Sequence, residues 1–226
     1  HNITISKALY SVFTDGRITK PSKVTTIYYG LTLTDPVDQS KEVTVPEGPF
    51  ALITGRLLEV KGHRYLIAAW KKVKESCPGL KLYLAGDGLL RDELEALVKK
   101  EGLTDDIIFL GFVPNPHPLV KKARFTIVTS TWEGFGLILL ESWLHKKPIV
   151  SFDAPAMNEV IDDEVNGLLV PFKNTDVLAE KIIWMNNHPQ KAVEMGEKGY
   201  EKLHSYYSLH RMTDETEVIY KKVTGN

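Results

Sequence analysis

Cysteine, net charge and long apolar runs are all scarce in this sequence of 226 residues. A single cysteine, Cys77, excludes an internal disulfide and fits a reducing compartment, where a structural thiol is the plainest interpretation. The 28 basic and 29 acidic residues leave a formal net charge of −1, so no bulk field favours nucleic acid or anionic lipid. An anionic ligand would therefore need a local site.

Signals for membranes, secretion and metals are missing as well. No apolar run approaches the roughly 18 residues of a membrane helix, and the amino end lacks a basic-then-apolar secretory signal. The seven histidines show no spacing typical of metal ligands, so we expect no metal. The chain begins with His1 rather than methionine, which suggests a fragment of a longer protein.

The composition that is present, 43% hydrophobic and 25% charged, is typical of one or two globular domains with a sizeable core. Residues 3–13 predict a short strand running into a helix, and Val24–Tyr29 predicts a strand closed by Gly30. Residues 31–48 lack apolar periodicity and are rich in turn formers, so they predict a linker. We therefore expect residues 1–30 to belong to one domain and residues 49–226 to form another.

From residue 50 onward, strand and helix patterns alternate, which predicts an α/β fold with a doubly wound parallel sheet of about six strands. The expected strands are residues 50–54, 80–85, 107–110, 124–128, 148–152 and 168–170. The expected helices are residues 65–74, 89–100, 119–123, 136–145 and 177–186, with two amphipathic helices between 190 and 223 that break near residue 208. Ligands of such sheets bind beyond the carboxyl ends of the strands, so those loops are the candidate sites.

The first three loops offer cations, glycines and prolines. Arg56 and Lys61 follow the first strand and could converge on a phosphate, although two exposed loop cations would be an ordinary surface feature. Gly88 ends a Gly-Asp-Gly turn that permits close backbone approach to a ligand or simply forms a tight turn. Val113 and Asn115 lie among prolines that fix the backbone and could present polar groups to a flat ring.

The fourth loop, TSTWEGFGLILLE, opens an apolar helix and holds two glutamates, Glu133 and Glu141. The helix dipole and unpaired backbone amides at its start make an anion site. The amides expected there belong to Gly134, Phe135, Gly136 and Leu137. Carboxylates readily accept hydrogen bonds from vicinal hydroxyl groups, so a diphosphate flanked by two sugar-like rings is a natural ligand. The plainer alternatives are an exposed loop acid for Glu133 and a buried partner of a lysine for Glu141.

The fifth loop, residues 153–159, ends in Glu159. This acid could cap or contact the same pocket, or it could belong to an acidic region at a helix start.

These segments together carry a resemblance: GRLLEVKGHRYLIAA, LYLAGDGLLRDELEAL, IIFLGFV, STWEGFGLILLES, NEVI and NGLLV. They resemble the donor-binding half of retaining GT-B glycosyltransferases, the family of glycogen and sucrose synthases and bacterial mannosyl- and glucosyltransferases. The match covers residues 50 to about 220, and the two glutamates eight positions apart are its most specific element. The resemblance implies a Rossmann-like half that binds a nucleotide-diphosphate sugar.

The resemblance also implies roles for individual residues. Arg56 and Lys61 would hold the diphosphate, with the amides at the helix start. Glu133 would contact the sugar, Glu141 the ribose, and the loop of Val113 and Asn115 the nucleobase. Transfer would proceed with retention, mainly through electrostatic stabilisation of the departing diphosphate, which makes Arg56, Lys61 and Glu133 the expected catalytic residues.

Partners and location follow from the same resemblance. The acceptor would be a glycan, a lipid or a small molecule, as in polysaccharide biosynthesis, and an amino-terminal acceptor domain would be missing except for residues 1–30. The chain alone would then be inactive. No cofactor, metal or nucleic acid is expected, and the location would be cytoplasmic, with the inner membrane face as a further option.

Some positions depart from the family pattern. Thr129 stands where proline is usual, Trp143 where a small residue is usual, and Lys146 where glycine is usual. The fifth loop has Ala156 and Met157 near the position of a common glycine pair, which leaves the sugar open. Two alternatives also remain: a non-catalytic half-protein that binds a nucleotide sugar or phosphorylated ligand with a partner chain, and an epimerase on the related scaffold.

Overall fold

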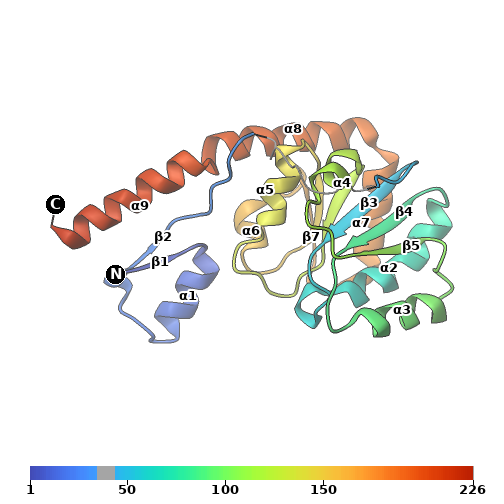
Figure 1. Cartoon of the computed structure of the whole chain (residues 1–226), viewed down its shortest axis with the longest axis horizontal. Coiled ribbons are helices and arrows are strands. Elements are labelled where there is room, and N and C mark those ends of the chain that lie inside the picture. Colours follow the sequence, from blue (N-terminus) through green and yellow to red (C-terminus); the bar gives the residue numbers. More distant parts are fainter. Residues whose placement is uncertain (35–43, 226) are drawn as a thin grey trace.

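The computed structural model describes residues 1–34 and 44–225, and its main body is a parallel sheet of six strands between helices (Figure 1). The strands are β3 (Phe50–Thr54), β4 (Lys81–Ala85), β5 (Ile107–Gly111), β6 (Phe125–Val128), β7 (Ile149–Phe152) and β8 (Leu168–Val170). Their order in the sheet is β5-β4-β3-β6-β7-β8, so the direction of winding reverses between β3 and β6. The prediction of a doubly wound sheet is confirmed, and the reversal marks the expected ligand crevice.

The helices of the body lie close to the predicted ranges. They are α2 (His63–Ser76), α3 (Arg91–Lys100), α4 (His117–Lys122), α5 (Leu137–Leu144), α6 (Met157–Val160), α7 (Thr175–Asn187), α8 (Pro189–Tyr206) and α9 (Leu209–Thr224). The sequence reading missed α6 and the short 3₁₀ helices η1 (Pro21–Lys23) and η2 (Glu59–Lys61). Helices of one turn show no recurring apolar period, so pattern alone does not reveal them.

The central strand β3 is buried on both faces. Ala51 and Ile53 join the larger core, which includes buried side chains of α2 and α7, while Phe50 and Leu52 join a smaller core with side chains of α4. Both faces of a central parallel strand need apolar cover, which explains the unbroken apolar run of this strand. The carboxyl end of β3 is thereby fixed within the sheet.

Residues 1–30 form a small unit beside the body, with β1 (Asn2–Thr4) and β2 (Val24–Thr26) paired in parallel and α1 (Lys7–Asp15) between them (Figure 1). The predicted strand over Val24–Tyr29 was too long. Its partner β1 ends at Thr4, which pairs with Thr26, so residues beyond 27 have no strand to pair with.

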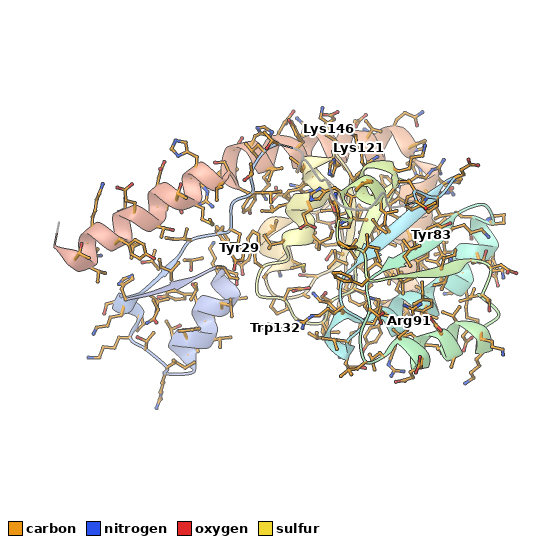
Figure 2. The ribbon with its side chains drawn as sticks, in the orientation of Figure 1. Tyr29, Tyr83, Arg91, Lys121, Trp132 and Lys146 are labelled. Atoms are coloured by element: carbon orange, nitrogen blue, oxygen red, sulfur yellow. The ribbon has the colours of Figure 1, made fainter. Side chains whose placement is uncertain are left out.

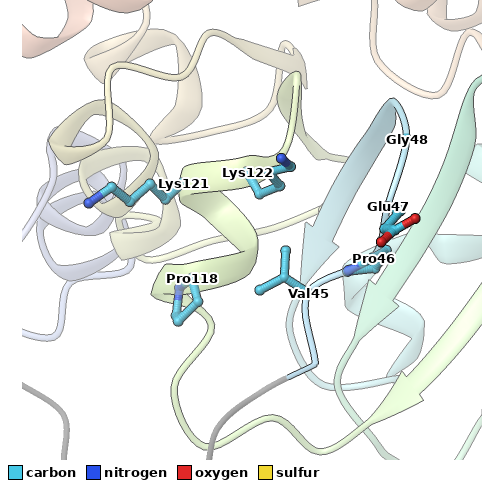
Figure 3. A pocket seen from close by; sticks show the side chains of 7 residues that line it. All are labelled: Val45, Pro46, Glu47, Gly48, Pro118, Lys121 and Lys122. Atoms are coloured by element: carbon cyan, nitrogen blue, oxygen red, sulfur yellow. The ribbon is translucent and has the colours of Figure 1, made fainter.

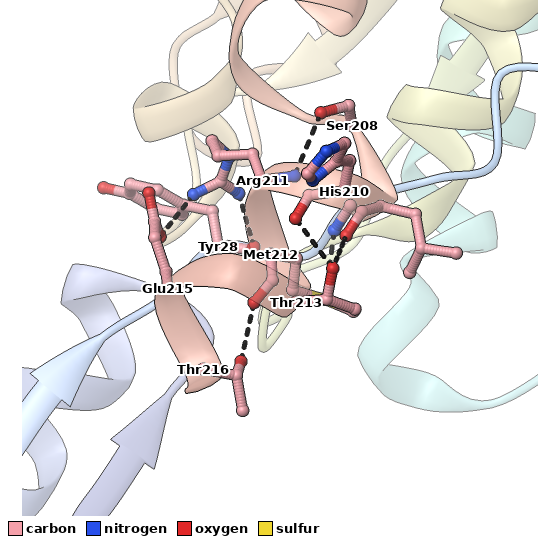
Figure 4. Close-up of polar contacts among 10 residues, drawn as sticks. Tyr28, Ser208, His210, Arg211, Met212, Thr213, Glu215 and Thr216 are labelled. Carbon is pink, nitrogen blue, oxygen red and sulfur yellow. Dashed lines mark hydrogen bonds and ion pairs between the residues drawn. The ribbon is translucent and has the colours of Figure 1, made fainter. Parts of the chain in front are cut away.

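The chain leaves this unit across the α8–α9 junction (Figure 4). The Leu31 amide donates to the Tyr207 carbonyl at 2.8 Å. The Arg211 guanidinium donates to the Tyr28 carbonyl at 2.7 Å, as Figure 4 shows. Gly30 is required here because a Cβ atom would lie 2.2 Å from the carbonyl oxygen of Ser208. Of the predicted linker, residues 35–43 lie outside the described residues, so the division into domains stays a prediction.

Helix α8 lies against the end of α5 at two glycines. A Cβ atom at Gly196 would lie 2.0 Å from the Lys146 carbonyl oxygen, and one at Gly199 would lie 2.1 Å from the Trp143 indole. Trp143 is fully buried, and its indole nitrogen donates to the carbonyl of Asn166 at 3.1 Å. The tryptophan that departs from the family pattern is therefore accommodated by a glycine on the facing helix.

Cys77 is buried at the end of α2, and the side-chain amide of Asn186 donates to its sulfur at 3.3 Å. Burial raises the pKa of the Cys77 thiol, which fits the structural interpretation. In the parts of the chain that the structure describes, no helix is long and apolar enough to span a bilayer.

Candidate functional site

Lys61 and Glu133 form an ion pair across the reversal point of the sheet. Lys61 ends η2 after β3, and Glu133 lies 72 positions later in the loop between β6 and α5. Glu133 also accepts a hydrogen bond from the Ser130 hydroxyl at 2.8 Å. The Glu133 side chain is only 15% exposed, so it is not the exposed loop acid of the plainer alternative. The structure thus brings two predicted site residues into contact.

The two loops that carry this pair are bonded to each other. The amide of Thr131 donates to the Val60 carbonyl at 2.7 Å, and the Thr129 hydroxyl donates to the Lys61 carbonyl at 2.9 Å. Gly62, at φ +67°, permits this contact because a Cβ atom would lie 2.0 Å from the Thr129 carbonyl oxygen. The hydroxyl groups that fix the loops were not predicted, although the run of Thr and Ser after β6 was visible in the sequence.

Arg56 lines a cavity of about 460 Å³ at the carboxyl ends of β3, β4 and β5. The lining residues are Thr54, Gly55, Arg56, Ala85, Gly86, Asp87, Phe112, Val113 and Pro116. Across residues 1–34 and 44–225, no acid forms an ion pair with the Arg56 guanidinium. The cavity therefore joins the predicted phosphate-binding arginine to the predicted nucleobase loop at Val113, within a mainly apolar wall.

Gly88 allows the loop after β4 to pack closely against the loop after β3. A Cβ atom there would lie 2.5 Å from the Leu57 carbonyl oxygen, and one at Gly86 would lie 1.8 Å from the Gly55 carbonyl oxygen. These close approaches let the loop after β4 bond to the loop after β3, with Leu57 donating to the Asp87 carbonyl at 2.9 Å. Contact of Gly88 with a ligand stays a prediction.

The start of α5 presents backbone amides toward the carboxyl edge of the sheet. Within the described residues, no protein acceptor takes the amide hydrogens of Gly134, Phe135, Gly136 or Leu137. Gly136, at φ +87°, begins the helix, and a Cβ atom there would lie 2.6 Å from the Met157 methyl carbon. Unpaired amides at a helix start form an anion site.

The side chain of Phe135 holds this turn in place by packing against aromatic rings. Its ring is 2% exposed and packs against Tyr28, Tyr29 and Tyr207, with centroid distances of 6.1, 5.6 and 5.8 Å. Its neighbour Trp132 is half exposed, on the side of the body that faces the amino-terminal unit (Figure 2). The amide-bearing turn is thus held between the body and residues 1–30.

Glu141 is a half-buried acid on α5 that faces the start of α4. Burial raises the pKa of its carboxyl, and the nearby His117 opposes that shift. In the described parts of the chain, no lysine pairs with Glu141, so the buried-partner alternative is not supported. His117 is hydrogen-bonded to His145 at 2.8 Å, and its backbone amide donates to the Asn115 side chain at 3.0 Å. Glu141 therefore faces the loop of Asn115, whose nucleobase contact stays a prediction.

Glu159 caps α1 in the amino-terminal unit. Its carboxylate accepts hydrogen bonds from the backbone amides of Lys7 and Ala8 at 2.7 and 2.8 Å, and from the Tyr28 hydroxyl at 3.0 Å. The sequence left open whether this acid caps or contacts the pocket or instead belongs to an acidic region at a helix start. The cap belongs to a helix about 150 positions away, which short-range patterns do not reveal.

Ala156 adopts a backbone conformation that favours glycine, at φ +71°. It is fully buried and precedes α6, in the loop where the family commonly has glycines. A left-handed alanine costs roughly 1–2 kcal/mol, so this loop stores a little strain beside the start of α5.

His63 is a buried neutral imidazole directly behind Lys61. Burial, with a smaller contribution from Lys61, lowers the pKa of His63 to about 4, and its Nδ1 atom has no hydrogen-bond partner among the described residues. The folded pKa is thus below the ordinary value of about 6.5, so the unfolded chain binds the proton first as pH falls.

We expect His63 to make the free energy of unfolding decrease as the pH is lowered. Its contribution is complete above pH 6.5, and about 2 kcal/mol should be lost between pH 7 and pH 5. Urea unfolding of the protein and of His63→Gln at both pH values measures this. A pH dependence that is the same in both proteins would contradict the buried neutral state.

A larger cavity, of about 620 Å³, lies elsewhere, between the segment leading into β3 and α4 (Figure 3). It is lined by Val45, Pro46, Glu47, Gly48, Pro118, Lys121 and Lys122, and it contains none of the predicted site residues. Size alone therefore does not identify the site. Among the residues described, no three His, Cys, Asp or Glu side chains gather as metal ligands.

Comparison with known proteins supports the resemblance found in the sequence. The family described as Glycosyl transferases group 1 matches residues 36–202. An uncharacterised glycosyltransferase of Methanocaldococcus jannaschii is 32% identical over 97% of the chain, and the match covers 59% of that protein. The α-D-kanosaminyltransferase of Streptomyces kanamyceticus is 27% identical over 77% of the chain, which corresponds to 46% of its own length.

Solved structures share the fold. HepE of Anabaena, crystallised with UDP and glucose, superimposes with a TM-score of 0.85 at 25% identity, covering 99% of this chain and 63% of that one. TarM of Staphylococcus aureus, in complex with UDP among other ligands, gives 0.83 at 21% identity, covering 94% of this chain and 42% of that one. The chain spans roughly half to three-fifths of the curated relatives it matches first.

Proposed function

The chain belongs to the group 1 family of GT-B glycosyltransferases, and from this premise we propose that it is the donor-binding part of a retaining enzyme. The donor would be a nucleotide-diphosphate sugar, bound at the carboxyl edge of the sheet between β3 and β6. The whole protein would transfer the sugar to a glycan, lipid or small-molecule acceptor.

One observation carries the proposal: three groups suited to a diphosphate follow β3 and β6, the two neighbouring strands at which the sheet order reverses. These groups are the Arg56 guanidinium, the Lys61 ammonium and the unpaired amides that open α5. Guanidinium and ammonium groups make charge-assisted hydrogen bonds to phosphate oxygens, and the α5 dipole adds to them. The mainly apolar cavity beside Val113 suits the flat base.

Each predicted residue then has a place along the donor. The diphosphate lies at the start of α5, where it competes with Glu133 for Lys61. Glu133, held by the Ser130 hydroxyl, accepts hydrogen bonds from hydroxyl groups of the transferred sugar. Glu141, without a lysine partner among the described residues, accepts hydrogen bonds from the ribose hydroxyls.

The proposed chemistry is electrostatic. The bond between the sugar and the diphosphate breaks, the acceptor oxygen bonds to the same face of the sugar, and the acceptor proton passes to a departing phosphate oxygen. Arg56, Lys61 and the α5 amides stabilise the negative charge that grows on the leaving group. The α-linkage in the names of two relatives, the kanosaminyltransferase and the poly(ribitol-phosphate) α-N-acetylglucosaminyltransferase of Staphylococcus aureus, supports retention if the donor is itself α-linked.

We propose that an acceptor domain accounts for much of the additional length of the relatives. Residues 1–30, a parallel β-α-β unit tied to the body through Glu159, would be its closing part. The chain alone would bind the donor without transferring the sugar. We place the whole enzyme in the cytoplasm, in polysaccharide biosynthesis, without a cofactor, a metal or nucleic acid.

Calorimetric titration with uridine, guanosine and adenosine diphosphates tests the donor class. We expect saturable binding of one nucleotide in preference to the others, with UDP first because HepE was crystallised with it. Absence of binding by all three would contradict the proposed function. Binding together with a natural partner chain that supplies the acceptor domain would instead favour a half-protein.

We expect Glu141 to recognise the ribose. Its half-buried carboxylate gains two hydroxyl donors from a ribonucleotide, and none from the 2′,3′-dideoxy analogue, so the analogue should bind about tenfold more weakly. Calorimetry with both nucleotides measures the difference, and Glu141→Gln should reduce it. Equal affinities would leave Glu141 as a structural acid.

A further inference from the structure

A second cationic cavity lies at the amino edge of the sheet, the edge opposite the donor site. Its volume is about 240 Å³, and it is bounded by the residues that lead into β6 and β7 and by the α7–α8 junction. Four cations line it, Lys122, Arg124, Lys146 and Lys147, and no acidic side chain among the described residues does. Lys146 lies along α8, away from Trp132 of the donor loop (Figure 2).

Three of these four charges have no carboxylate partner in the described parts of the chain. Lys146 pairs with Glu197 at 2.9 Å, whereas Arg124 donates to the neutral side chain of Asn186 at 2.6 Å. Lys122 and Lys147 form no ion pair with the described residues. The cavity therefore concentrates positive charge in a protein whose formal net charge is −1.

Lys147 makes this concentration costly. Its side chain is half-buried, and burial, with Lys122 beside it, lowers the pKa of its ammonium group. Lys122, Arg124 and Lys146 are exposed, so the cost falls mainly on Lys147, whose half-buried charge beside a like charge is unfavourable unless an anion joins them. A ligand with about two negative charges would neutralise Lys122 and Lys147 and would still find hydrogen-bond donors on Arg124.

We propose that this cavity binds the phosphate group of a phosphomonoester. A phosphomonoester carries between about −1.5 and −2 charges near pH 7 and has three acceptor oxygens, which match the unpaired cations. Pro148, Met185 and Val193 form an apolar wall for a short organic group attached to the phosphate. The cavity is about half the volume of the one at the donor site, so it suits a small ester or a lipid headgroup rather than a nucleotide sugar.

Titration with glycerol 3-phosphate in 150 mM sodium chloride, followed by amide chemical shifts in NMR, tests the proposal. At this ionic strength weak surface binding is largely screened. We expect saturable shifts in residues 122–125 and 146–149 while the donor-site residues 134–137 stay unchanged. The double substitution Lys122→Gln and Lys147→Gln should raise the Kd at least tenfold, and Lys99→Gln with Lys100→Gln on α3 is the matched control.

A second arm distinguishes the two sources of the phosphomonoester. Vesicles of phosphatidylcholine with phosphatidic acid present it as a headgroup, and co-sedimentation that is lost in the double variant indicates a lipid ligand. Shifts with glycerol 3-phosphate without co-sedimentation indicate a soluble ligand. The proposal is overturned if neither probe binds, if shifts are confined to the donor site, or if the double variant binds like the unsubstituted protein. The two sites lie at opposite edges of the sheet, so UDP binding tests the proposed function independently of these outcomes.

Discussion

Replacing Arg56 and Lys61 together by alanine is expected to weaken nucleoside diphosphate binding by at least about 2 kcal/mol, or roughly 30-fold in Kd. Both cations follow β3, and the Lys61 side chain passes 3.8 Å from the Cβ position of Gly55. Charge-assisted hydrogen bonds to a diphosphate would be lost from both. Calorimetry with UDP measures the loss.

The matched control is Lys99→Ala with Lys100→Ala, which removes two exposed cations from α3 and keeps the net charge equal to that of the test variant. Because Lys61 also pairs with Glu133, its removal leaves a partly buried acid whose remaining partner within residues 1–34 and 44–225 is Ser130. Thermal unfolding of both variants therefore accompanies the titrations. A test variant that folds and binds UDP as well as the control would refute the diphosphate role.

Gly199→Ala is expected to lower the free energy of unfolding by about 1–3 kcal/mol, although alanine normally favours a helix by about 1 kcal/mol over glycine. The new Cβ atom would lie 2.1 Å from the indole of Trp143, which is fully buried and cannot move aside. Either α8 shifts away from α5 or the indole leaves its position, and buried area is lost in both cases. Urea unfolding measures the effect.

Lys198→Ala, at an exposed position of the same helix, controls for helix propensity and should change stability by less than about 1 kcal/mol. Trp143→Leu should cost less in the Gly199→Ala background than in the unsubstituted protein, because it relieves the clash. Additive effects of the two substitutions, or a Gly199→Ala protein as stable as the original, would contradict the packing described.

The sheet was predictable because its strands are short apolar runs, each closed by turn residues, and because a parallel sheet needs both faces covered. Local patterns failed at Val24–Tyr29 and at α6. Chain composition favoured a strand through Tyr29, but β1 offers partners only as far as Thr26. The single turn of α6 depends on packing beneath the start of α5, where Met157 fills the space that Gly136 leaves.

For the candidate site, the sequence indicated which loops follow the strands but not the contacts within those loops. Position after a strand was enough to select Arg56, Lys61 and the turn after Glu133, since carboxyl ends of parallel strands share one edge. The Lys61–Glu133 pair joins positions 72 apart and depends on β3 and β6 being neighbours, which strand order alone decides. Likewise, the carboxylate of Glu159 caps a helix start that only the folded chain brings to it, whereas the side chain of Asn115 bonds the amide of His117 just two positions away.

The measurement that tests the account most directly is amide chemical-shift mapping of UDP on the folded chain. If the diphosphate lies between the β3 loop and the start of α5, the largest shifts will fall on residues 55–62 and 134–137, with smaller ones around Val113. Saturable binding whose shifts lie outside these loops, or no binding at millimolar UDP, would contradict the assignment of this edge as the donor site.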